Sequence, residues 1–392
     1  LALLCAAIRF RKAAFEFFLA PLKSWRDILP DKEQAIPAAL CLAAFASVLC
    51  WPGSLGWAER DAAFLNDNLT PGGFGMELKS ADARQWLSPT FLFWRTGLVL
   101  SSDILFLAFL KTLLVAGSIL WAARKLHSIA GRRNWEIYAF LFFLFPTASC
   151  AIRALSAASL SIPFALFGML LLFKFLQTNK AAWFIASFAL FLSTVVLSSC
   201  GVALPIAALL VLALRLETFR DFVHRVAVLA VLPAVAAFAA AFAAHRFFGH
   251  PAFYEPGRMA DAALRLFSLS SFDSIFPPWL EMREDSYPNG YGWGAILSLT
   301  MLAIGFLLAF IGSIHAFRRW PSAGRDPWAA LHLFSLISCM LTIVLSTFLC
   351  DAPDLGAASA SLPCLVFLET GGVGWLQRRV PHFRIAFAVF FL

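Results

Sequence analysis

Long apolar runs separated by short polar loops occupy most of the chain. Residues 1–20 are apolar but carry four interrupting charges, a pattern typical of an amphipathic helix at a membrane interface. After a polar linker we expect apolar helices at 36–51, 104–121, 135–150, 155–173, 182–198, 202–214, 226–244, 293–314, 329–349, 359–376 and 385–392. A perpendicular transmembrane helix needs about 20 such residues. The pattern predicts an all-α, polytopic integral membrane protein with about ten or eleven transmembrane helices.

Composition strengthens this interpretation. Hydrophobic residues make up 61% of the 392 positions and charged residues 14%, with a mean hydropathy of +0.79. Soluble domains are typically about 45–50% apolar and about 25% charged. The balance excludes a soluble enzyme, a disordered chain, a coiled coil and a disulfide-stapled secreted module. We therefore expect one transmembrane domain over residues 1–392.

The charges alternate in sign from loop to loop. One set of loops is basic, with residues in 9–26, 124–133, 174–180, 215–225, 318–325 and 378–384. The other set is acidic or nearly uncharged, namely 52–90, 151–154, 199–201, 245–292 and 350–358. Basic loops stay on the cytoplasmic side of a membrane. The alternation therefore predicts a cytoplasmic N-terminus, and it explains the net charge of +8 without a nucleic-acid partner.

Two long loops then share the non-cytoplasmic side, 52–90 and 245–292, whereas 1–35 is a cytoplasmic or interfacial segment. Binding residues favour loops on a rigid scaffold, so we expect function on the outer face. That membrane would be a bacterial inner membrane or the endoplasmic reticulum. Four cysteines, at the predicted outer helix ends, would pair in an oxidising compartment or else remain separate buried thiols: Cys50, Cys150, Cys200 and Cys350.

The first outer loop carries candidate catalytic carboxylates. Four residues recur there at helical spacing, which predicts a short amphipathic helix on the membrane surface: Trp57, Asp61, Phe64 and Leu65. Such a helix would present Glu59 and Asp61, and nearby Asp67, toward the membrane. A carboxylate there can act as general base on a sugar hydroxyl. The alternative is a solvated helix with a surface charge cluster.

Two arginines lie at predicted outer boundaries, against the positive-inside trend. Arg95 precedes the helix at 104–121, and Arg153 precedes the helix at 155–173. An arginine at such a boundary is a functional candidate, because its planar fork suits a phosphate or pyrophosphate group. The alternative is an arginine that reaches the interface or pairs with a loop acid. Asp103 and Lys111, eight residues apart, could instead pair with other helices.

The second outer loop mixes aromatic and charged residues. Pro277 and Pro278 break any helix there, and Glu281 and Arg283 follow directly. Aromatic rings beside carboxylates are typical of a carbohydrate site, so both residues are candidate substrate contacts. The alternative is a loop that Trp279 anchors in the headgroup region.

A family resemblance rests on local sequence. Residues 140–148 read Phe-Leu-Phe-Phe-Leu-Phe-Pro-Thr-Ala and residues 155–160 read Leu-Ser-Ala-Ala-Ser-Leu. Ala182-Trp183 then opens a run that ends with Ser-Ser-Cys-Gly at 198–201. This text, within 140–214, resembles the core of the mannosyltransferases that add the second mannose to glycosylphosphatidylinositol. The acidic first outer loop and large later outer loop resemble the wider GT-C superfamily of membrane glycosyltransferases.

The resemblance implies a glycosyltransferase at the non-cytoplasmic face that takes a sugar, with mannose the nearest match, from a polyprenyl-phosphate donor. Glu59 or Asp61 would deprotonate the acceptor, and Arg95 or Arg153 would stabilise the leaving phosphate. The partners implied are the lipid-linked donor, membrane lipids and other membrane proteins. No cofactor is implied, and a divalent metal stays an open alternative.

Three polar signatures of the family are absent or displaced. Ala58 follows Trp57 where the family has aspartate, residues 155–157 read Leu-Ser-Ala where it has Tyr-Ser-Glu, and Ser198 lies near the place of an arginine. The second hypothesis is therefore a non-catalytic GT-C-like subunit of a larger complex. A lipid or solute transporter is the third, although no internal repeat supports it.

Overall fold

The computed structural model describes residues 35–50, 104–129, 135–153, 157–214, 293–349 and 358–380. All elements in these ranges are helices, which confirms the all-α prediction for this part of the chain. The α-helices are α2 (Ala35–Cys50), α5 (Ile104–Ile129), α6 (Trp135–Leu144), α7 (Pro146–Arg153), α8 (Ser161–Thr178), α9 (Ala181–Leu197), α10 (Ala203–Leu214), α14 (Trp293–Arg318), α15 (Pro327–Leu349) and α17 (Leu362–Arg379). Short 3-10 turns lie at η7 (Ala157–Leu160), η8 (Ser199–Val202), η13 (Trp320–Ser322) and η14 (Ser359–Ser361).

Four described helices are long and apolar enough to cross a membrane. The qualifying segments are Phe106–Leu126, Ala158–Thr178, Thr300–Arg318 and Pro327–Ser346. Shorter apolar helices occupy Ala181–Val195 and Cys200–Ala213. The described part thus has the helices of a membrane protein, as the hydropathy pattern predicts. The full count of ten or eleven spans stays a prediction, because the runs at 226–244 and 385–392 lie outside the described residues.

Several boundaries differ from those expected, three of them in ways that change the description. The run at 135–150 divides at Phe145, because Pro146 has no N–H to continue the helical hydrogen bonding, and α7 then reaches Arg153. The run expected from 155 begins instead as the 3-10 turn η7, and α8 starts at Ser161. Helix α5 continues past 121 to Ile129. The expected outer loop at 151–154 is therefore partly helical.

Local sequence explains where two helices start and stop. Asp326 caps α15, since its Oδ1 accepts a hydrogen bond from the backbone N–H of Trp328 at 2.9 Å, and Pro327 opens the first turn. Asn179 ends α8 in the left-handed conformation at φ 53°, and its backbone N–H donates to the oxygen of Phe175. Asparagine tolerates that conformation better than most residues. The polar linkers near 179 and 326 therefore turn the chain sharply.

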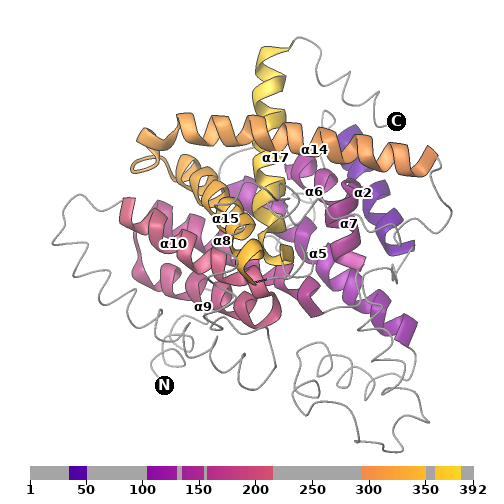
Figure 1. Cartoon of the computed structure of the whole chain (residues 1–392), viewed down its shortest axis with the longest axis horizontal. Helices are drawn as coiled ribbons and strands as arrows, with labels where there is room; N and C mark the ends of the chain where they lie inside the picture. Colours follow the sequence, from indigo (N-terminus) through magenta and orange to yellow (C-terminus); the bar gives the residue numbers. More distant parts are fainter. Residues whose placement is uncertain are drawn as a thin grey trace, which may run out of the picture.

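Helices α8, α9 and α15 form one packed group (Figure 1). Helices α8 and α9 run antiparallel, because the Ser187 hydroxyl donates to the oxygen of Gly168 at 2.7 Å while the Phe175 and Phe184 rings lie 5.1 Å apart. Helix α15 joins this pair through Phe334, whose ring stacks on Phe191 at 5.3 Å. Aromatic pairs of this kind add to the burial energy of a core.

Helix ends that carry basic residues lie together. The Gln177 side chain at the end of α8 donates to the oxygen of Ile129 at the end of α5, at 3.2 Å. The ring of Phe173, also near the end of α8, lies 5.7 Å from that of Trp328 at the start of α15. One end of the bundle therefore carries basic residues near the end of α5, near the end of α8 and just before α15, namely Lys125, Lys174 and Arg325. The alternation of loop charge requires this arrangement, and the side of the membrane stays a prediction.

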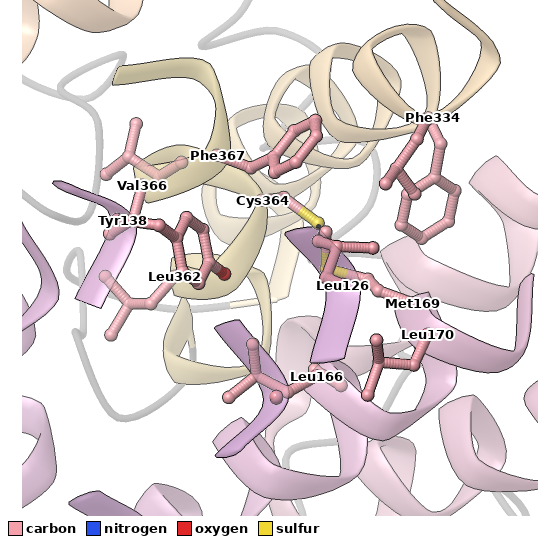
Figure 2. Packing of buried hydrophobic residues seen from close by; sticks show 14 of the residues in the cluster. Leu126, Tyr138, Leu166, Met169, Leu170, Phe334, Leu362, Cys364, Val366 and Phe367 are labelled. Carbon is pink, nitrogen blue, oxygen red and sulfur yellow. Dashed lines mark hydrogen bonds between the residues drawn. The ribbon is translucent and has the colours of Figure 1, made fainter. Parts of the chain in front are cut away.

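Helices α14 and α17 cross each other, and α17 also packs against α6, α8 and α15 (Figure 1). Figure 2 shows the core around α17, where the Cys364 sulfur points toward Met169 of α8 and Tyr138 of α6 lies against another side of α17. The Tyr138 hydroxyl donates to the oxygen of Pro363 at 3.0 Å, and the Cys364 thiol lies 3.9 Å from the sulfur of Met169 on α8. Helix α17 therefore links α6, α8 and α14.

Candidate functional site

Most residues that the sequence proposes for the site lie outside the described residues: Glu59, Asp61, Asp67, Arg95, Glu281 and Arg283. Arg153 is the exception. It is the last residue of α7, although its side chain is not among those described. Whether these residues share one outward cavity therefore stays a prediction.

The end of the bundle near α7 is fastened by a serine cluster. Ser161 of α8 and Ser359 of η14 both donate to the oxygen of Ala158, at 2.5 and 2.8 Å, and their hydroxyls lie 2.9 Å apart. Both side chains are buried. Because both hydroxyls have hydrogen-bond partners within the cluster, it joins η7 to η14 and is better explained as structure than as a binding site.

A tight, glycine-lined crossing holds α14 against α17. A side chain added at Gly312 would collide with the backbone oxygen of Leu368, and one added at Gly372 would collide with that of Leu308. Small residues allow helix backbones to approach this closely inside membranes. The two helices are therefore in backbone contact at the crossing.

Glu369 lies buried at this crossing. Its side chain is 4% exposed, and its Oε2 atom has no hydrogen-bond partner among the described residues. A Cβ added at Gly305 of α14 would lie 3.2 Å from its Oε1 atom and 3.3 Å from the Phe145 ring. The carboxyl group therefore points into the space that the missing side chain of Gly305 leaves.

An aromatic and histidine cluster lies on the α15 side of α17. The His332 ring is 4.6 Å from that of Phe367, 5.6 Å from that of Trp328 and 6.2 Å from that of His315. Its Nδ1 atom lies 3.0 Å from the oxygen of Trp328, a hydrogen bond within α15. The cluster joins the C-terminal end of α14 to the N-terminal part of α15.

Sequence reasoning overlooked several buried polar residues. Besides Glu369 and His332, the interior holds Glu136 at 2% exposure and Thr112, whose hydroxyl has no partner among the described residues. Lys111, which with Asp103 was expected from sequence to pair with other helices, is also 2% exposed. A signal was present for Glu369, which is the one acidic residue in the apolar run 359–376. The loop-charge pattern points instead to Arg95 and Arg153, which lie at predicted helix boundaries, and it gives no reason to choose Glu369.

The side chains of the described residues bear on both metal binding and thiol pairing. There, no group of three or more His, Cys, Asp or Glu side chains is arranged to hold a metal ion. Cys41, Cys339 and Cys364 are buried free thiols, and Cys200 is buried in η8. The side chains of Cys50, Cys150 and Cys350 lie outside the description, so pairing at the outer ends stays a prediction.

Comparison of the chain with protein-family models, with curated proteins and with solved structures finds no match. We therefore infer the function from the residues themselves.

Proposed function

We propose that this protein is a membrane-embedded glycosyltransferase that moves a sugar from a polyprenyl-phosphate donor to an acceptor at the non-cytoplasmic face. The position of Arg153 is the main support. It ends α7 beside η7, whose Ala158 contacts the first residue of α8, Ser161. The basic ends gather at the other end of α8, about 26 Å away at 1.5 Å per residue. Arg153 thus lies at the end of α8 opposite to the basic helix ends. The positive-inside trend does not account for a positive charge at that end, which makes Arg153 a functional candidate.

The resembling segment adds a second line of support. Residues 140–214 comprise the second half of α6 and all of α7, α8, α9 and α10, and within this unit α8 packs along α9 and α9 contacts α10. Such a unit is a rigid scaffold from which an outer end can present loops. Under this proposal the loops at 52–90 and 245–292 carry the site, and Arg153 contributes from the scaffold.

The proposed reaction assigns one role to each candidate. Glu59 or Asp61 accepts the proton of the acceptor hydroxyl as its oxygen bonds to the anomeric carbon of the sugar. The bond from that carbon to the phosphate oxygen breaks, and the polyprenyl phosphate leaves with the electron pair. Arg95 or Arg153 stabilises the negative charge that develops on this phosphate. Asp67, Glu281 and Arg283 bind the sugar and its acceptor.

The test is sugar transfer by the full chain reconstituted in lipid nanodiscs with a labelled polyprenyl-phosphate sugar. We expect Asp61→Asn or Glu59→Gln to lower kcat by about 100-fold or more, the usual effect of losing a general base. Asp326→Asn is the matched control, because asparagine also caps a helix well. If both loop variants turn over at the wild-type rate, the catalytic role of these carboxylates is excluded.

A non-catalytic subunit is the second candidate, and the missing family signatures at Ala58, Ala157 and Ser198 favour it. Under this alternative the chain co-purifies stably with membrane partners and transfers no sugar from any lipid-linked donor. Turnover by the isolated chain would eliminate it. Purification in mild detergent followed by the same transfer assay, with and without the co-purified proteins, separates the two candidates.

A further inference from the structure

The α14–α17 crossing contains an acidic side chain where no charge would be expected. Glu369 belongs to the buried face of α17, with apolar neighbours Leu365, Val366 and Leu368. Its carboxyl points at Gly305 of α14, at the place where the two helices are in backbone contact. The crossing thus combines small residues with a buried carboxyl that lacks a partner at Oε2 among the described residues.

Among the described residues, the ionisable groups around Glu369 do not supply a compensating positive charge. From α6, Tyr138 contributes a hydroxyl that donates to the oxygen of Pro363. From α15, Cys339 contributes a thiol, and His332 lies against Gly371, which is two positions from Glu369 and so on another face of α17. The α14 residue against the carboxyl is Gly305, and on α17 itself Cys364 contacts Met169.

Burial with no cation beside it among the described residues determines the protonation state of the Glu369 carboxyl group. An isolated carboxylate in an apolar interior is far more costly than a neutral acid, so such a group takes up a proton. An ionisable side chain inside a membrane domain is a functional candidate by default. We propose that Glu369 is a proton-binding site inside the helical bundle, which holds an exchangeable proton at the crossing of α14 and α17.

Proton release is then coupled to the position of α14. Gly312 and Gly372 leave no room for water between the two backbones, since even a Cβ atom would collide there. An ionised Glu369 needs water or a cation around it, and that requires α14 to move away from α17. The proton therefore stabilises the closed crossing, and its loss favours an open one. This coupling does not depend on the proposed sugar transfer.

Infrared difference spectroscopy tests the proposal directly. The full chain in nanodiscs is compared with Glu369→Gln at neutral pH, and we expect the variant to lose one carbonyl-stretch band of a protonated carboxylic acid. In heavy water this wild-type band should shift, because the proton exchanges. Glu136→Gln is the matched control. Burial raises the pKa of Glu136 to about 6, and the nearby charge of Arg124 opposes that rise, so Glu136 is mostly ionised at neutral pH and the variant should keep the band.

Three results would overturn the proposal. Equal spectra of wild type and Glu369→Gln would show that Glu369 is ionised at neutral pH. A band that never shifts in heavy water would show a static structural acid. Loss of the band on adding sodium at constant pH would make Glu369 a sodium site. If Glu369→Gln does not fold, a pH titration of the wild-type chain with isotope-labelled glutamate gives the same three answers.

Discussion

Hydroxyl side chains in the described core mostly donate to backbone oxygens of their own helix. Ser335 donates to Leu331 at 3.0 Å, Thr342 to Ser338 at 2.8 Å and Thr370 to Val366 at 2.8 Å. In a bilayer no water is available to satisfy such groups, so this local pairing removes their cost. Polar atoms that lack a partner among the described residues are therefore informative, and Oε2 of Glu369 is one of them.

Tyr138 offers a test of a single long-range hydrogen bond. Its fully buried hydroxyl donates to the oxygen of Pro363, so Tyr138→Phe should lower the free energy of unfolding by about 1 kcal/mol. Reversible unfolding in mixed detergent micelles measures the change. Phe106→Leu, at a side chain that is 48% exposed, is the control and should stay within about 0.5 kcal/mol. Equal effects of the two changes would contradict this role of the hydroxyl.

Glu369 also shows why residue-level prediction falls short. Its place in an apolar run was visible in the sequence, but its burial against Gly305 depends on which helices pair. Hydropathy does not contain that information. Arg153, in contrast, was placed at a helix boundary from the loop-charge pattern, and it does end α7.

At the scale of helices, the sequence predicted most boundaries within a few residues. Runs such as 182–198 and 202–214 match α9 and α10 closely, because polar linkers and helix-ending residues mark their ends. The single helix expected over 135–150 was wrong, since Pro146 divides it. The start of α8 was also missed, because a 3-10 turn has the same hydropathy as the helix that follows.

Glycine-to-alanine changes at the crossing of α14 and α17 can distinguish the effect of packing on stability from the effect of helix propensity. Gly312→Ala and Gly372→Ala should each destabilise the protein by about 1–3 kcal/mol, because the new methyl group meets a backbone oxygen. Gly374→Ala is the matched control in α17, where nothing lies within 4 Å, and it should stabilise by up to about 1 kcal/mol. Thermal unfolding in detergent measures all three. A neutral Gly372→Ala would show that the crossing is looser than described.

For the whole molecule, lipid contact follows from the exposed apolar side chains. Phe310 and Phe317 of α14 are each 63% exposed, and Leu114 of α5 is 58% exposed. Exposed apolar surface of this kind suits contact with lipid. We expect the fluorescence of Phe310→Trp, in a variant lacking the native tryptophans, to be strongly quenched by brominated lipids. Phe334→Trp, at a fully buried position, should be little quenched. Similar quenching of both would contradict this orientation.

The membrane topology has its own test. Ser322 lies exposed in the basic linker between α14 and α15, which the positive-inside trend assigns to the cytoplasm. In a variant without the native cysteines, Ser322→Cys should react with a membrane-impermeant maleimide only after the cytoplasmic side is opened. Reaction in intact cells would reverse the predicted orientation, and with it the side on which Arg153 lies.

The serine cluster has a consequence for how the protein is made. Ser161 and Ser359 are 198 positions apart, and Tyr138 and Pro363 are 225 apart. During translation the partners of α6 and α8 therefore emerge long after these helices enter the membrane. Contacts between distant segments form late in folding. Ser161 can already donate to Ala158, whereas the Tyr138 hydroxyl gains its partner Pro363 only when α17 arrives, so assembly of the core is completed at that point.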